Sequence, residues 1–99
     1  YDANGSISDD VAEQAEQTFK NIAQALENAG SSIKDVVRVR YILKDRRQFQ
    51  DTWPVLQKWL GDVRPAATMI QADLLEDVMK IEIEVTAVKA GAVVVAAPL

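Results

Sequence analysis

The chain has 99 residues, 48% of them hydrophobic, which suits one small domain with its own core and excludes a disordered segment. Its 15 acidic and 11 basic side chains give a net charge of −4, which argues against nucleic acid as a partner because phosphate binding needs a concentrated basic surface. With no cysteine and no histidine, any catalysis must use carboxylates, Arg, Lys, Tyr, backbone groups or water, and we expect neither a metal site nor a cofactor.

The first expected element is a helix over about residues 9–29. Ser8 is the expected N-cap, and Asp9 and Asp10 would occupy the first turn, at the positive end of the helix dipole. Gly30 is the expected C-terminal stop. Apolar side chains recur at helical spacing and predict a buried stripe of Val11, Ala15, Phe19, Ile22, Leu26 and Ala29.

A half-buried strand is expected over residues 36–43, VVRVRYIL, with Val37, Val39, Tyr41 and Leu43 on its buried face. A second helix should follow, with Phe49, Trp53, Leu56 and Leu60 on its apolar stripe and Gly61 at its end. Pro54 lies inside that pattern. Because proline is well tolerated only in a first turn, the regular helix is expected to begin near Trp53, with Asp51 or Thr52 as its cap.

The second and third strands are expected over residues 66–74 and 80–88. The third alternates cleanly, with Ile81, Ile83, Val85 and Ala87 on one face and Lys80, Glu82, Glu84 and Thr86 on the other. This order of elements predicts an α+β domain with both helices on the apolar face of one sheet. The other face mixes charged and apolar residues, which fits either cross-strand ion pairs in water or a subunit interface with a polar cleft.

Two groups are candidates for chemistry on these residues alone. Glu82 and Glu84 lie about 7 Å apart on one face and can do acid–base work, but the plainer interpretation pairs them with Arg38 and Arg40. Arg64, before Pro65, either binds a carboxylate in a cleft or is a solvated loop cation. Without further information the sequence predicts a small oligomeric α+β domain and no particular reaction.

Three stretches, taken together, resemble the Rid/YjgF family of reactive-intermediate (imine) deaminases, once called L-PSP endoribonucleases. They read VAEQAEQTFKNIAQALENAGSSIKDVVRV, KDRRQFQDTWPVLQKWLGDVRPA and MKIEIEVTAV. The resemblance covers about residues 5–89, so we expect one domain over residues 1–89 that lacks the family's N-terminal hairpin before Tyr1. Residues 90–99 would be a C-terminal extension, either a strand that covers a sheet edge, a swapped arm or an unrelated addition.

The resemblance implies a chorismate-mutase-like fold, with two helices on one face of a mixed sheet, assembled into a barrel-like homotrimer. Family active sites lie in clefts between subunits. There an Arg holds the substrate's carboxylate, a Glu positions the water that attacks an imine carbon, and a backbone carbonyl contacts that water. Carried over by motif, the catalytic positions are Glu82 for the water and Met69 for the carbonyl.

The same resemblance assigns the substrate-binding positions to Thr68, Ala67 and Trp53, with Arg40 as a replacement cation. Ala67 stands where the family has its Arg, and Trp53 stands where deaminating members often have Asn. A methyl group cannot replace a bidentate guanidinium, so the chain is expected to belong to a branch without the deaminase arginine.

The resulting expectation is a homotrimer that binds a small polar metabolite in its clefts, with altered hydrolytic imine or enamine deaminase activity. The alternative is a non-catalytic ligand-binding or regulatory trimer. A ribonuclease or translation inhibitor is disfavoured by the net charge of −4 and the absence of histidine. No targeting segment is visible, and the longest apolar run is too short to cross a bilayer, so we expect a cytoplasmic protein with no membrane partner.

Overall fold

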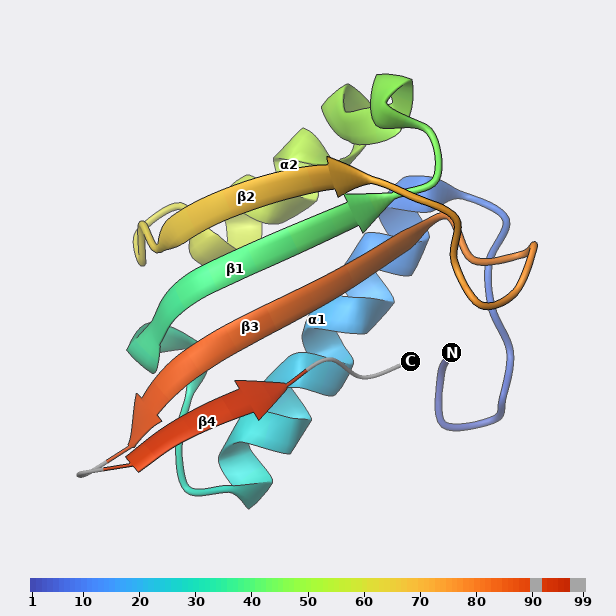
Figure 1. Ribbon diagram of the computed structural model, residues 1–99. Helices are drawn as coiled ribbons and strands as arrows, with labels where there is room; N and C mark the ends of the chain where they lie inside the picture. The colour runs from blue at the N-terminus through green and yellow to red at the C-terminus, as the bar shows by residue number, and fades with distance from the viewer. Residues whose placement is uncertain (90–91, 97–99) are drawn as a thin grey trace.

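The structure, a computed structural model, describes residues 1–89 and 92–96. Two helices, α1 (Val11–Asn28) and α2 (Phe49–Leu60), cover one face of a four-stranded sheet (Figure 1). The strands are β1 (Val36–Leu43), β2 (Ala66–Gln71), β3 (Ile81–Lys89) and β4 (Ala92–Ala96), in the spatial order β2-β1-β3-β4. β2 runs parallel to β1, whereas β1 with β3 and β3 with β4 are antiparallel. The predicted α+β class, two helices on one face of a mixed sheet, is confirmed.

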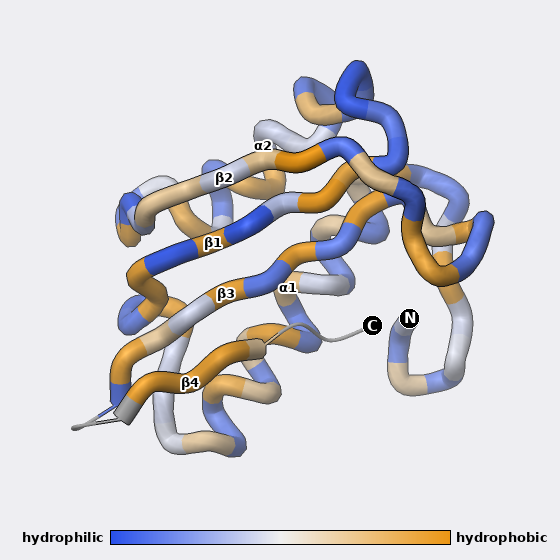
Figure 2. The backbone as a smooth tube through the Cα atoms, viewed as in Figure 1, coloured by the Kyte–Doolittle hydropathy of each residue, from blue (hydrophilic) through white to orange (hydrophobic). Residues whose placement is uncertain are grey.

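The core lies between the helices and the sheet. From α1 it takes the predicted positions Val11, Ala15, Phe19, Ile22 and Leu26, all buried. From β3 it takes Ile81, Ile83, Val85 and Ala87, whose alternation with polar residues is visible along the strand in Figure 2. Each large apolar side chain buried in this way contributes about 1.5–3 kcal/mol to folding. The predicted faces of α1 and β3 are therefore confirmed, except at Ala29, which lies just after the end of α1 and is only half-buried.

The start of α1 differs from the prediction by two residues. Asp10, in extended backbone conformation, is the N-cap, and its carboxylate accepts the Glu13 N–H at 2.9 Å. Ser8 instead accepts the Asp10 N–H at 3.1 Å, so its expected role as N-cap is wrong. The predicted stop is confirmed: Gly30 has a φ of 80°, and the Ser31 N–H after it donates to the Leu26 carbonyl at 2.8 Å.

The start of α2 was predicted about one turn too late. Asp45 accepts the Arg47 N–H at 3.0 Å and opens a short 3-10 turn, Arg46–Gln48, that leads directly into α2 at Phe49. Pro54 therefore lies inside the helix, where it removes one N–H near the N-terminal end. Thr52 is buried and its hydroxyl donates to the Phe49 carbonyl at 2.6 Å, so it packs in the core and is no cap.

Two details of the strands also differ. The pairing of β1 with β3 shifts register between Val36 and Arg38, and this bulge turns Val37 outward, with 49% of its surface exposed. The expected burial of Val37 is wrong for that reason, and Val36 is buried instead. β2 ends at Gln71, three residues before the predicted end, and its residues are exposed because it is an edge strand.

The C-terminal stretch forms β4, which pairs with residues 85–89 of β3. Val94 and Ala96 pack against the core, whereas Val93 and Val95 are exposed. The parts of the expected extension at residues 90–91 and 97–99 lie outside the described residues. Across the described ranges, no helix combines the length and the apolar character that crossing a membrane requires.

Candidate functional site

A groove with a volume of about 500 Å³ lies between α2 and the edge strand β2. Four of the six predicted site residues line it: Trp53, Ala67, Thr68 and Met69. Arg64 and Pro65, in the turn that connects α2 to β2, also line it. The structure thus brings together every predicted position except Arg40 and Glu82.

The wall of this α2–β2 groove is apolar and largely aromatic. Ala67 and Met69 pair with Val39 and Tyr41, whose buried side chains face the helices, so both β2 residues face α2. Phe49 lies between Tyr41 and Trp53, with ring centroids 6.2 Å and 6.1 Å away. Burial raises the pKa of Tyr41 to about 12, so its hydroxyl stays neutral at physiological pH. A planar or apolar group is therefore the ligand part that this wall suits.

The backbone of β2 adds polar groups at the groove. Ala72 donates its N–H to the Leu43 carbonyl at 3.0 Å, so the backbone of Ala72 points toward β1. Successive residues of a strand point their backbone groups to opposite sides. The N–H and C=O of Ala67 and Met69 therefore point to the free edge of the sheet. The Met69 carbonyl, predicted to contact a water, is directed to that edge.

Arg40 lies on the opposite, open face of the sheet. Its Nη2 is 3.1 Å from Glu84 Oε2, and Arg38 Nη2 is 3.3 Å from Glu84 Oε1. Arg40 is also the register partner of Thr68, and its Nε is buried without a hydrogen-bond partner among the described residues. The predicted ion pairs with Arg38 and Arg40 are therefore present at Glu84, whose carboxylate contacts both guanidinium groups.

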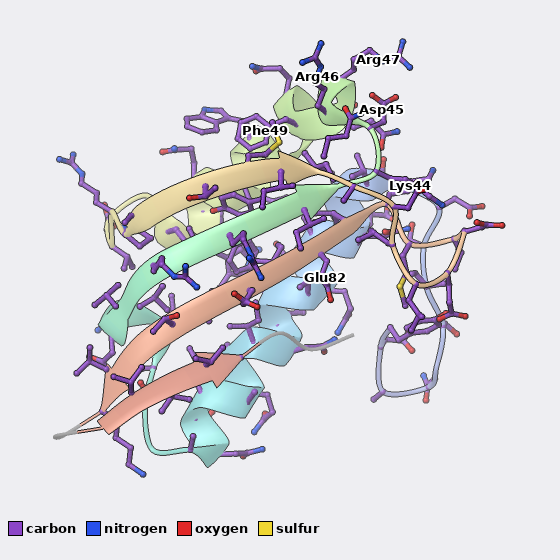
Figure 3. The ribbon with its side chains drawn as sticks, viewed as in Figure 1. Lys44, Asp45, Arg46, Arg47, Phe49 and Glu82 are labelled. Carbon is purple, nitrogen blue, oxygen red and sulfur yellow. The ribbon has the colours of Figure 1, made fainter. Side chains whose placement is uncertain are left out.

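Glu82 belongs neither to the α2–β2 groove nor to the ion pairs around Glu84. It lies opposite Ile42 on the open face, and within residues 1–89 and 92–96 its carboxylate forms no ion pair. It lines a second pocket, of about 490 Å³, beside α1 and the N-terminal segment. Figure 3 shows Glu82 on β3, apart from Arg46 and Phe49 at the β1–α2 connection. Ile42 in turn pairs with Ile70, so Glu82 lies two strands, roughly 10 Å, from β2.

Among the residues that sequence reasoning did not assign to the groove are its other two aromatic residues, Tyr41 and Phe49, which it assigned only to the core. The signal for Phe49 is its spacing of four residues from Trp53, which puts both rings on one helix face. In the part of the chain that the structure describes, no group of three or more His, Cys, Asp or Glu residues is placed to hold a metal ion.

Comparisons with known proteins agree with this architecture. The Endoribonuclease L-PSP family model matches residues 1–89. A RutC family protein of Pyrococcus abyssi is 34% identical over 83 residues, which are 84% of this chain and 65% of that protein. The human 2-iminobutanoate/2-iminopropanoate deaminase is 30% identical over 83 residues, which are 84% of this chain and 61% of the human protein. The matched region is thus just under two thirds of either relative.

A solved structure gives the same result for the fold. A member of the YjgF/YER057c/UK114 family from Mycobacterium tuberculosis superposes with a TM-score of 0.79 at 30% identity, over 83% of this chain and 70% of that one. The family match spans α1 through β3, including both helices and the strands that carry the predicted site residues. The chain therefore belongs to the Endoribonuclease L-PSP family, the Rid/YjgF family that its sequence resembles.

Proposed function

We propose that this chain forms a cytoplasmic homotrimer, binds a small polar metabolite in the clefts between its subunits, and hydrolyses an imine or enamine there with the help of Glu82. The name of the human relative, an iminobutanoate and iminopropanoate deaminase, supports this class of reaction. The matched part is only 61% of the human protein's length. The proposed activity therefore depends on the residues of this chain.

The observation that carries the proposal is the separation of the predicted residues within one copy. Trp53, Ala67 and Met69 line the α2–β2 groove at the free edge of β2, whereas Glu82 lies on the open face of β3. One copy alone therefore does not bring Glu82 to the groove. A second copy that packs its open face beside the β2 edge of the first brings the two half-sites together.

The open face carries the apolar surface that such packing needs. Four apolar side chains lie on this face and are 39–68% exposed in one copy: Ile70, Val88, Val93 and Val95. Covering apolar surface contributes about 25 cal/mol per Å² removed from water. The neighbouring charges are already neutralised in part, because Glu84 pairs with Arg38 and Arg40. This mixture of apolar and paired polar groups is typical of subunit interfaces.

The proposed reaction uses groups that this chain possesses. Glu82 and the Met69 carbonyl accept hydrogen bonds from a water and orient its oxygen toward the imine carbon. The water oxygen bonds to that carbon while Glu82 takes a proton and passes it to the imine nitrogen. This adds a hydroxyl group to the carbon. The carbon–nitrogen bond then breaks as the hydroxyl proton moves, through Glu82, to the nitrogen, which leaves a carbonyl compound and ammonia.

Ammonia release tests the proposal. Imino acids generated freshly by an amino-acid oxidase are given to the chain, and ammonia is followed over the uncatalysed background. We expect acceleration that Glu82→Gln abolishes, because an amide cannot accept the proton. Glu27→Gln, an exposed position on α1, is the matched control and should keep full activity.

The same assay separates the proposal from the non-catalytic alternative. Two observations favour that alternative: Arg40 is paired with Glu84, and Ala67 offers only a methyl group to the groove. No acceleration by the parent chain, together with ligand-dependent thermal stabilisation, would favour a binding or regulatory protein and refute the reaction.

A further inference from the structure

Arg64 has an unusual backbone conformation at the end of α2. Its φ is 53°, and among the described residues no other non-glycine residue has a positive φ. Its N–H donates to the Leu60 carbonyl at 3.1 Å, which closes the last turn after the helix, and Pro65 follows. A side chain disfavours this left-handed region, and the residue before proline is normally extended. Glycine would fit the position better, yet the chain has arginine.

The side chain of Arg64 lines the α2–β2 groove, and it is the charged residue among the groove's described lining. Its guanidinium makes no ion pair or hydrogen bond within the described residues, whereas those of Arg38, Arg40 and Arg47 are all paired with carboxylates. The Trp53 ring and the small Ala67 side chain line the same groove, and the edge N–H groups of β2 border it. An unpaired guanidinium beside an aromatic wall is complementary to an anion with an apolar body.

We propose that Arg64 is the carboxylate-binding residue of the α2–β2 groove, and that the groove takes a carboxylate whose apolar, planar body packs against Trp53. This inference rests on the proposed function for the groove as a ligand site. In this arrangement the ligand's carboxylate binds at the turn before β2. Arg38 and Arg40, on the open face, remain paired with Glu84.

A purely structural role for Arg64 makes a different prediction. A cation at the C-terminal end of a helix interacts favourably with the helix dipole. If that were its role, Arg64→Gly would lower the melting temperature and leave ligand binding unchanged. Under our proposal the same substitution raises the melting temperature, because glycine accepts the positive φ, and weakens carboxylate binding.

The test uses two probes of one shape, 3-phenylpropionate and its neutral amide, 3-phenylpropionamide. Each is titrated into the ¹⁵N-labelled full chain and followed by amide and indole chemical shifts. We expect the carboxylate to shift the Ala67 and Met69 amides and the Trp53 indole, with the amide probe binding at least tenfold more weakly. Arg64→Gly should weaken carboxylate binding at least tenfold and leave the amide probe unchanged. Arg46→Gln, which removes an exposed cation outside the groove, is the charge-matched control.

Other results overturn the proposal: no shifts at millimolar 3-phenylpropionate, equal binding of the two probes, or equal carboxylate binding by Arg64→Gly. Circular dichroism checks the fold of each variant. If Arg64→Gly does not fold, Arg64→Asn carries the same comparison, since asparagine also tolerates a positive φ. Glu82→Gln separates this inference from the proposed reaction, because it should lose ammonia release and keep carboxylate binding. If Arg64→Gly binds the carboxylate as tightly as the parent chain and the parent chain still releases ammonia, the role of Arg64 is refuted and the proposed reaction is not.

Discussion

Glu84, two residues along β3 from Glu82, receives the guanidinium of Arg40 at 3.1 Å across the sheet. Arg38 reaches the other oxygen of the same carboxylate at 3.3 Å. Two similar glutamates on one strand face thus have different roles. Glu84 neutralises the centre of the open face, whereas the Glu82 carboxylate has no cation partner among the described residues and borders a pocket.

Removing the Glu84 charge should destabilise the chain modestly. Glu84→Gln leaves two guanidinium groups without their anion, but Arg38 and Arg40 are 54% and 36% exposed, so solvent screens much of the loss. Exposed ion pairs are worth about 0–1 kcal/mol each, so we expect a loss of about 1 kcal/mol in the free energy of unfolding. Urea unfolding measures this loss, with Glu27→Gln as the control variant. A loss above about 3 kcal/mol would contradict the description of these ion pairs as exposed.

The helix cap can be tested at two adjacent aspartates. Asp10→Ala removes the carboxylate that accepts the Glu13 N–H, so it should lower the free energy of unfolding by about 1 kcal/mol. Asp9→Ala changes the charge equally but removes no cap, so its effect should be smaller than about 0.5 kcal/mol. Equal losses for the two variants would show that charge near α1, and not the cap, is responsible.

Glu16 predicts a pH dependence of stability. Burial of its carboxyl opposes ionisation, but hydrogen bonds from Lys58 and Trp59 outweigh it and lower the pKa below the ordinary 4.5. A lowered pKa in the folded state stabilises the fold above pH 4.5, and this contribution is lost as the pH falls through the folded pKa.

Urea unfolding at a series of pH values below about 5 measures this contribution. Glu16→Gln should flatten the curve over that window. Asp35→Asn, which removes an exposed carboxylate with no ion pair among the described residues, serves as the control and should leave the slope as it is. If Glu16→Gln leaves the slope of unfolding free energy against pH unchanged, the Glu16 carboxyl is not the cause of the pH dependence.

The bulge in β1 predicts opposite outcomes for two neighbouring valines. Val39→Ala empties space in the core and should cost about 2 kcal/mol, since Val39 is 1% exposed. Val37→Ala should cost less than about 0.5 kcal/mol, because the bulge turns this side chain outward. Similar costs for the two variants would mean that Val37 is buried, as simple alternation predicted.

Periodicity predicted most of the fold because burial follows it closely. The stripe of α1 and the alternation of β3 came directly from the spacing of apolar residues, and both are confirmed. The errors arose where short-range hydrogen bonds override periodicity. Asp10, and not Ser8, is the N-cap of α1. A 3-10 turn leads into α2 before Trp53, and the bulge in β1 exposes Val37.

The candidate site was predictable only in part. The family motif gave Ala67, Thr68 and Met69, which all line the groove. Only Ala67 and Met69 face α2, because Thr68, between them on the strand, is the register partner of Arg40 on the open face. Which partner Arg40 would choose depends on strand register, because Glu84 lies opposite it and Glu82 does not. The sequence left open whether Arg64 faces a cleft or solvent, because its positive φ and its place in the groove depend on how α2 ends against β2.

Under the proposed function, Glu82 of one copy meets the α2–β2 groove of a neighbour, which requires an assembly. Sedimentation equilibrium of the parent chain over a range of concentrations tests this most directly. The account predicts a single species with three times the 10.9 kDa mass of one chain. A stable monomer at all concentrations would contradict it, because the groove and Glu82 would then remain on separate surfaces.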